Sequence, residues 1–203
     1  MGGVVFDCDG VLVDSEPASV RSWSLAISAL GIATEASDIE RWVGSTDRAI
    51  AEHYAPLLGL DPSALLARAE VELRQVLATD GVRPFPDAIR LLDAVFERRL
   101  PVAVATNSVR WRLDAVLEAA GIGHLVPLSV ASNEVEAPKP APDVYVEAVG
   151  RIGVEAGRVL VIEDTPTGIA AGRAAGCRVV AVDRGGFSPA SLAQADIVVD
   201  SLG

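Results

Sequence analysis

The chain has 203 residues, which allows one ordinary domain or a domain that carries a smaller insertion. Half of its residues are apolar but only 4% are aromatic, so the core must consist mainly of alanine, valine, leucine and isoleucine. The formal net charge of −11 disfavours nucleic acids and anionic membrane surfaces as partners, because both are themselves negatively charged.

The sequence shows no pattern of membrane insertion or secretion. No apolar run reaches the roughly 18 residues that a membrane-spanning helix needs, and the first residues lack the basic segment of a secretory signal. Cys8 and Cys177 are too few for a disulfide framework. We therefore expect a soluble, cytoplasmic protein and a monomer, with no nucleic-acid and no membrane partner.

Short apolar runs predict strands that are buried on both faces, as in a parallel sheet. They lie at 4–6, 102–105, 128–130, 159–162, 179–182 and 197–199. After the second run, helical segments alternate with the strands: 108–121 with Ser108 as its N-cap, 143–152, 165–175, and a short one that starts at 188–189. This alternation predicts an α/β fold with a doubly wound parallel sheet.

The stretch between the first two strands differs, because it shows helical periodicity and no strand pattern. Predicted helices cover 17–30, 46–58 and 61–79, and Ser37 with Glu40 has the spacing of a capping box. A helix over 86–98 then leads back to the sheet. We therefore predict a core domain of residues 1–15 and 83–203, with an inserted α-helical cap domain of residues 16–82.

Polar residues follow four of the predicted strands at their carboxyl ends, where open α/β sheets bind ligands. Four carboxyl groups there favour a hard divalent cation such as Mg²⁺. Hydroxyl and amide donors at a helix start favour an anion, and one ammonium group adds a positive charge. Together they predict a site for a phosphoryl group. The residues are Asp7 and Asp9, Thr106 with Asn107 and Ser108, Lys139, and Glu163 with Asp164.

Each of these patterns alone has an ordinary structural explanation as a turn or a helix cap. An EF-hand loop fits poorly, because position 12 counted from Asp7 is Ala18. The coincidence at four strand ends is what favours a site. Lys139 is the only lysine among 17 basic residues and lies between Pro138 and Pro140, which indicates a need for a compact charge rather than a planar guanidinium.

The same residues resemble the motifs of the haloacid dehalogenase (HAD) superfamily of phosphohydrolases. Residues 7–15 are similar to its first motif, 105–108 to the second, 137–140 to the third and 161–165 to the fourth. Order and spacing match over essentially the whole chain, and the helical insertion resembles the cap of the β-phosphoglucomutase-like phosphatases. The resemblance implies a HAD-like Rossmannoid core with a helical cap.

The resemblance also implies a Mg²⁺-dependent phosphatase and assigns roles to its residues. Asp7 would be the nucleophile that forms an aspartyl phosphate, and Asp9 the general acid and then the general base. Thr106, Asn107 and Lys139 would bind the phosphate. The metal ligands would be Asp7, the backbone carbonyl of Asp9, Asp164, and Glu163 directly or through water.

The implied partner is a small phosphorylated metabolite, with a sugar phosphate as the first candidate. Candidate substrate contacts from the cap are Glu16, Arg21, Ser45, Thr46 and Arg48. A β-phosphoglucomutase-like phosphotransferase remains an alternative, although Ser19 stands where the mutases have a histidine. A catalytically silent sensor of a phosphate ligand also remains open.

Overall fold

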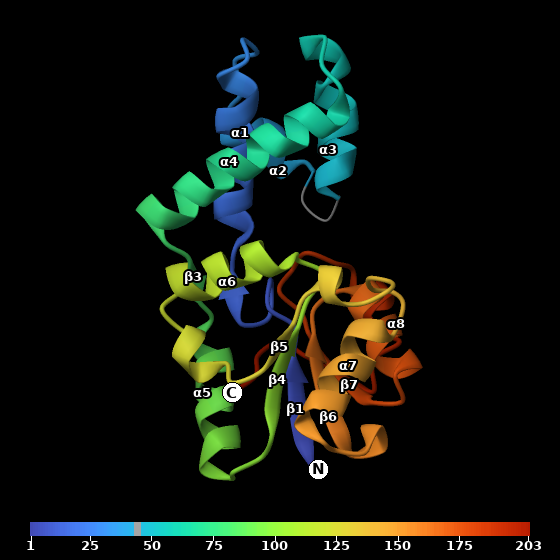
Figure 1. Cartoon of the computed structure of the whole chain (residues 1–203). Coiled ribbons are helices and arrows are strands. Elements are labelled where there is room, and N and C mark those ends of the chain that lie inside the picture. Colours follow the sequence, from blue (N-terminus) through green and yellow to red (C-terminus); the bar gives the residue numbers. More distant parts are fainter. Residues whose placement is uncertain (43–45) are drawn as a thin grey trace. The chain divides into compact units, whose positions relative to one another are not determined.

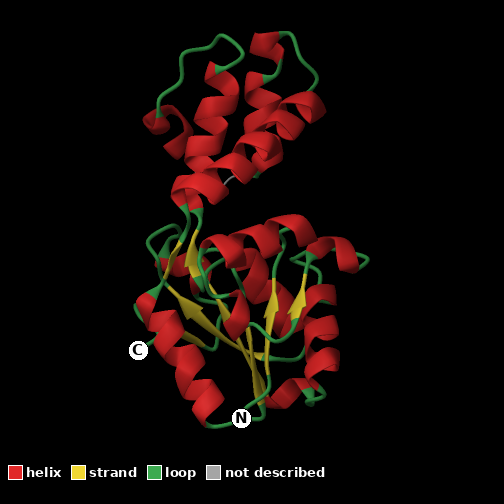
Figure 2. Cartoon of the chain, turned by 60° about the vertical axis from the view of Figure 1, so that its left-hand side comes forward, coloured by secondary structure: helices red, strands yellow, loops and turns green. Residues whose placement is uncertain are grey.

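The computed structural model describes residues 1–42 and 46–203, and the chain divides into two compact units. The core unit comprises Met1–Asp14 and Arg83–Gly203, and the cap unit comprises Ser15–Val82. The strands belong to the core unit, whereas the described part of the cap unit consists of helices and loops (Figure 2). No described helix combines the length and the apolar character that crossing a membrane requires.

A six-stranded parallel sheet organises the core unit, in the order β5-β4-β1-β6-β7-β8. The strands are β1 (Gly3–Phe6), β4 (Val102–Ala105), β5 (Ser129–Val130), β6 (Val159–Glu163), β7 (Arg178–Val182) and β8 (Ile197–Val199). Within β1, Phe6 is paired with Val104 of β4 and with Ile162 of β6. The carboxyl ends of β4, β1 and β6 therefore lie side by side where the strand order reverses, the usual ligand position in such sheets.

Helices cover both faces of this sheet. Figure 1 shows α5 (Pro86–Glu97) and α6 (Arg110–Ala119) on one side, and α7 (Asp143–Ile152) and α8 (Pro166–Ala174) on the other. The core between the sheet and the second pair includes Val5, Val161, Tyr145 and Ile169, all fully buried. Thr165 caps α8 by accepting a hydrogen bond from the Gly168 N–H. A short helix, α9 (Pro189–Leu192), precedes β8.

The cap unit is a small helical bundle with its own apolar core. Its helices are α1 (Glu16–Ser28), α2 (Ala36–Glu40), α3 (Asp47–Tyr54) and α4 (Pro62–Asp80), with a 3₁₀ turn, η1 (Pro56–Leu58), before α4. Trp23, Ile27, Ile50 and Leu65 are buried together in this core. The Trp23 indole N–H donates to the Asp47 carboxylate at 2.9 Å, which ties α1 to α3.

The structure confirms the predicted fold class and corrects several details. The capping box of α2 is formed by Glu35 and Asp38 rather than by Ser37 and Glu40. Helix α6 begins at Arg110 with Val109 as its N-cap, because the Ser108 side chain is engaged elsewhere. The predicted helix 46–58 ends at residue 54, and η1 follows.

Two short strands were not predicted. β2 (Val13–Asp14) and β3 (Arg83–Pro84) pair antiparallel, with Val13 opposite Pro84 and Asp14 opposite Arg83. Two residues are too few to show an alternating pattern, and Pro84 is a residue that sequence patterns count against strands. The pair lies in the core unit, where the chain leaves for the cap unit and where it returns.

Candidate active site

The sheet brings the predicted site residues of the core unit to one place. Asp7 follows β1, Thr106 follows β4, and Glu163 is the last residue of β6. Asp7, Thr106 and Glu163 are all buried, with exposed fractions of 6%, 2% and 0%. Buried polar side chains of this kind are tolerated only where partners satisfy them, so their partners define the site.

Lys139 is the centre of this cluster although it comes from a loop and not from a strand. Its Nζ donates to Asp7 Oδ1 at 2.6 Å, to Glu163 Oε1 at 2.7 Å and to the Ala105 carbonyl at 2.9 Å. All three of its N–H donors are thus used. Burial alone would lower the pKa of Lys139, but the two carboxylates raise it above its ordinary value, so the amine stays charged.

The loop that carries Lys139 is held by Asn107. The Asn107 Oδ1 accepts the Lys139 backbone N–H at 2.7 Å, and its Nδ2 donates to the Lys139 carbonyl at 3.1 Å. Because the side-chain amide is engaged in this way, the backbone N–H is the group of Asn107 that suits a phosphate oxygen. Thr106 accepts the Ser108 N–H at 3.0 Å through its hydroxyl oxygen, which fixes that side chain.

Glu163 is surrounded by donors. Its Oε1 accepts hydrogen bonds from Lys139 and from the Tyr145 hydroxyl, the latter at 2.7 Å. Its Oε2 accepts from the N–H groups of Asp164 and Thr165 and from the Thr165 hydroxyl, all at 3.0–3.1 Å. Five hydrogen bonds make Glu163 well suited to fix Lys139 and the start of α8. Tyr145 was not identified from the sequence, where it reads only as one more apolar position of α7.

One side-chain oxygen of Asp9 is also held by a hydrogen bond. The Ser108 hydroxyl donates to Asp9 Oδ2 at 2.9 Å, across 99 positions of sequence. The sequence analysis read Ser108 as a helix cap and therefore missed this contact. A carboxyl group that is to give and take a proton needs such an orientation, because proton transfer depends on hydrogen-bond geometry.

Three carboxylates of the described chain are grouped closely enough to hold a metal ion. One oxygen each of Asp7, Glu163 and Asp164 lies within 4.8 Å of the others. Asp164 Oδ1 is buried without a hydrogen-bond partner, which is costly unless another group, such as a cation, satisfies it. Gly10 packs so closely against Asp164 that a Cβ there would overlap its carboxylate, and its φ of +80° favours glycine.

The charges of the cluster are unbalanced without a cation. Burial raises the pKa of Asp7 to about 7, and Lys139 offsets only part of this rise. Burial, with the charges of Glu163 and Asp7, raises the pKa of Asp164 well above its ordinary value. Burial alone would raise the pKa of Glu163, but the Lys139 ammonium and the hydrogen bonds from Tyr145 and Thr165 together lower it. One ammonium therefore cannot compensate all the carboxylates, and a dication fits both the oxygen-only donor set and the deficit.

The described candidate substrate residues of the cap unit form ion pairs within that unit or lie at the start of its helices. Arg21 forms an ion pair with Asp80 at 2.8 Å, and Arg48 forms one with Glu52 at 2.7 Å. Thr46 is the N-cap of α3 and accepts the Ala49 N–H. Glu16 is the first residue of α1. Ser45 lies outside the described residues.

A parallel α/β sheet with acids, a lysine, and hydroxyl and backbone N–H donors at its switch point is suited to binding and transferring a phosphoryl group. The sequence profile of the haloacid dehalogenase-like hydrolases matches residues 4–182, and the chain belongs to this family.

Curated relatives and solved structures agree with this assignment. The chain is 34% identical over 184 residues to fructose-1-phosphate phosphatase of Escherichia coli, covering 89% of this chain and 95% of the relative. It is 31% identical over 202 residues to hexitol phosphatase A of the same organism, covering 98% and 91%. A HAD family hydrolase of Deinococcus radiodurans, solved with phosphate and sodium, superimposes with a TM-score of 0.79 at 28% identity, covering 100% and 92%. The chain is thus an enzyme of the phosphoric monoester hydrolase class.

Proposed function

We propose that this chain is a Mg²⁺-dependent phosphatase that hydrolyses a small phosphorylated metabolite, with a sugar phosphate as the first candidate, through an aspartyl-phosphate intermediate on Asp7. The observation that carries the proposal is the Lys139 ammonium bonded to Asp7, beside the buried carboxylate of Glu163 and the partly buried one of Asp164. The names of the two Escherichia coli relatives support the sugar-phosphate class.

The positive charge in the site follows from the electrostatics of the proposed reaction. A carboxylate and a phosphate ester repel each other, so attack requires positive charge between them. Lys139 supplies one such charge. Mg²⁺, held by Asp7, Asp164 and the Asp9 backbone carbonyl with Glu163 alongside, would supply the remaining charge and ionise Asp7 fully.

The reaction proceeds in two displacements at phosphorus. An Asp7 oxygen forms a bond to phosphorus while the ester bond breaks, and the Asp9 carboxyl gives its proton to the leaving alkoxide. The ionised Asp9 then takes a proton from water, whose oxygen attacks the phosphorus and releases phosphate from Asp7. The Asn107 backbone N–H and the Thr106 hydroxyl hold the phosphate oxygens, and the Ser108 hydroxyl orients Asp9 for both proton transfers.

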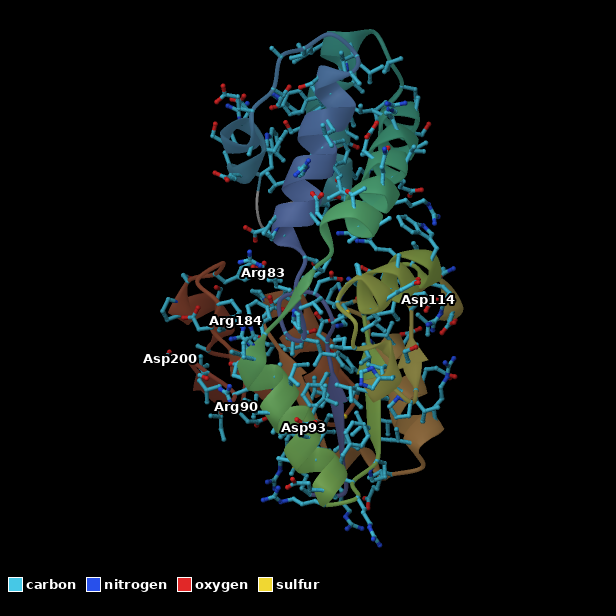
Figure 3. The ribbon with its side chains drawn as sticks, turned by 90° about the vertical axis from the view of Figure 1, so that its left-hand side faces the viewer. Arg83, Arg90, Asp93, Asp114, Arg184 and Asp200 are labelled. Atoms are coloured by element: carbon cyan, nitrogen blue, oxygen red, sulfur yellow. The ribbon has the colours of Figure 1, made fainter. Side chains whose placement is uncertain are left out.

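The test is phosphate release from fructose 1-phosphate, hexitol phosphates, glucose 6-phosphate, phosphoglycolate and p-nitrophenyl phosphate, with Mg²⁺ and with EDTA. We expect Mg²⁺-dependent turnover of at least one ester and a loss of about 10⁴-fold or more in Asp7→Asn. The matched control is Asp93→Asn, an exposed acid on α5 that is labelled in Figure 3. Full activity in Asp7→Asn would refute the covalent intermediate.

The same experiment separates the alternatives. With β-glucose 1-phosphate, a phosphatase releases glucose and phosphate, whereas a mutase yields glucose 6-phosphate. A protein that binds phosphate in the presence of Mg²⁺ but turns over no ester would be a sensor, and the proposal would be wrong.

A further inference from the structure

A second, partly buried ion pair lies in the core unit, outside the cluster of Lys139. Arg184, in the segment after β7, faces Asp87 at the start of α5. Its Nη1 donates to Asp87 Oδ2 at 2.9 Å and its Nη2 to Asp87 Oδ1 at 3.0 Å, in a bidentate arrangement. The guanidinium also stacks on the Phe85 ring, 3.9 Å from the ring centroid. Figure 3 labels Arg184 on the side of the core unit where α5 lies.

Asp87 is anchored by more than Arg184. Its carboxylate also accepts the N–H of Ala88 at 2.9 Å, the N–H of Leu202 at 2.9 Å and the Ser201 hydroxyl at 3.2 Å. Burial alone would raise the pKa of Asp87, but Arg184 and the N–H groups of Leu202 and Ala88 hold it well below its ordinary value. The carboxylate is therefore a fixed point that joins α5 to the segment following β8.

The remaining donors of Arg184 reach the loop that carries the reactive aspartates. Its Nε donates to the Gly10 carbonyl at 3.3 Å and its Nη2 to the Val11 carbonyl at 3.4 Å. Gly10 follows Asp9 directly and packs against the Asp164 carboxylate. The guanidinium thus connects the fixed carboxylate of Asp87 to the backbone beside Asp9 and Asp164.

We propose that Asp87 and Arg184 are positioning residues, which hold the Gly10–Val11 turn so that Asp9 and Asp164 keep their places in the site. This inference rests on the proposed function for its effect on catalysis. A lysine cannot replace Arg184, because a single ammonium cannot bind a carboxylate bidentately and reach two carbonyls at once. Misplacement of a catalytic group by about 1 Å can cost about 10²-fold in rate.

The variants are Arg184→Lys, Arg184→Met, Asp87→Asn and the double variant Asp87→Asn/Arg184→Lys. The matched control is Leu92→Ala, which removes buried apolar volume from the same helix, α5, but none of the hydrogen bonds of Asp87 and Arg184. Phosphatase kinetics are measured at a temperature at which circular dichroism shows every variant folded. Hydrogen–deuterium exchange of residues 8–13 reports on the turn itself, since Leu12 and Val13 both donate their N–H groups to the Cys8 carbonyl.

We expect Arg184→Lys to lower kcat by about tenfold to a hundredfold with KM changed by less than about twofold, and to speed exchange in residues 8–13. Arg184→Lys should retain more thermal stability than Arg184→Met yet lose as much kcat. The double variant should be no worse than the more damaging single variant, because the two residues act as one unit. Leu92→Ala should lower the melting temperature and leave both kcat and this exchange unchanged.

Two results would overturn the inference: unchanged exchange in residues 8–13 of Arg184→Lys, or a loss of stability with kcat intact. If the wild-type chain hydrolyses no ester, the proposed function fails by itself. The exchange measurement then still decides whether Arg184 holds the turn.

Discussion

Two ion pairs, one from each unit of the chain, differ sharply in burial. In the core unit, the side chains of Lys139 and Glu163 are 3% and 0% exposed and are held by several hydrogen bonds each. In the cap unit, Arg48 and Glu52 are 80% and 52% exposed and pair only as neighbours on one helix. Burying charge is costly unless many partners compensate it. We therefore expect substitutions of the buried pair to change both stability and activity, and substitutions of the exposed pair to change stability little.

Glycine has different uses at the candidate site and away from it. In the core unit, a Cβ at Gly168 would overlap the Glu163 carboxylate, and one at Gly10 would overlap Asp164. In the cap unit, Gly31 and Gly59 have open space around them, and their positive φ angles only end helical segments. Close packing against acids is thus a property of the site.

The largest effect should come from removing the buried ammonium. Lys139→Met leaves the carboxylates of Asp7 and Glu163 unpaired, so we expect a loss of about 3–5 kcal/mol in the free energy of unfolding and at least about 10²-fold in kcat. The cap control Glu52→Gln breaks the Arg48–Glu52 pair, whose two side chains are exposed on one helix, and should leave the free energy of unfolding nearly unchanged.

Lys139→Arg keeps the charge if Lys139→Met fails to fold. We expect it to fold but to remain at least about tenfold less active, because the planar guanidinium does not fit a pocket built for three converging acceptors. Chemical denaturation and steady-state kinetics provide the measurements. Equal losses of stability in Lys139→Met and Glu52→Gln would show that burial does not distinguish these two ion pairs.

The close approach of Gly168 to Glu163 predicts the next largest effect. Gly168→Ala forces the Glu163 carboxylate to move, and we expect a loss of about 1–3 kcal/mol together with reduced activity. Gly150→Ala, inside α7 with no heavy atom within 4 Å of the added Cβ, should instead stabilise by about 0.5–1 kcal/mol. A neutral Gly168→Ala, shown by thermal denaturation, would mean that Glu163 is not held tightly.

If Asp164 is a metal ligand, its substitution should change the free energy of unfolding by an intermediate amount. A carboxyl group whose pKa is raised on folding destabilises the protein as the pH rises above its unfolded pKa of about 3.9. Asp164→Asn removes this loss, so without metal at pH 7 we expect it to be more stable than wild type by about 1–2 kcal/mol.

Mg²⁺ at about 100 times its Kd should stabilise the wild type by about 2.7 kcal/mol and Asp164→Asn much less. Calorimetric melting with Mg²⁺ and with EDTA measures both quantities, and Asp93→Asn is the control. An equal Mg²⁺ shift in wild type and Asp164→Asn would exclude Asp164 as a ligand.

The smallest effect on stability is expected for the cap. Arg48→Ala should leave the melting temperature unchanged, because an exposed pair on one helix contributes little. If Arg48 contacts substrate as proposed, KM should rise with kcat nearly constant. Glu52→Gln breaks the same ion pair but keeps the arginine, so its KM should stay at the wild-type value. A rise in KM for both variants would point to the ion pair rather than to Arg48.

Much of the fold followed from local pattern. The apolar runs at 102–105 and 159–162 coincide with β4 and all but the last residue of β6, and the predicted helix 143–152 is α7. The wrong predictions concern helix boundaries at which two local sequence rules favour different residues. Glu35 rather than Ser37 starts the cap of α2, since a glutamate side chain can cap as well, and Pro56 divides the predicted helix 46–58.

The sequence alone determined which residue types follow which strands, because alternating apolar runs and helix signals are local, and strand ends of a parallel sheet share one edge by topology. Only the tertiary structure decided which atoms meet there. The Ser108 hydroxyl on Asp9, Tyr145 on Glu163 and Arg184 on Asp87 join positions 99, 18 and 97 residues apart. Such contacts depend on strand order and on how each helix is rotated against the sheet, which packing of the whole core sets and no short stretch of sequence records.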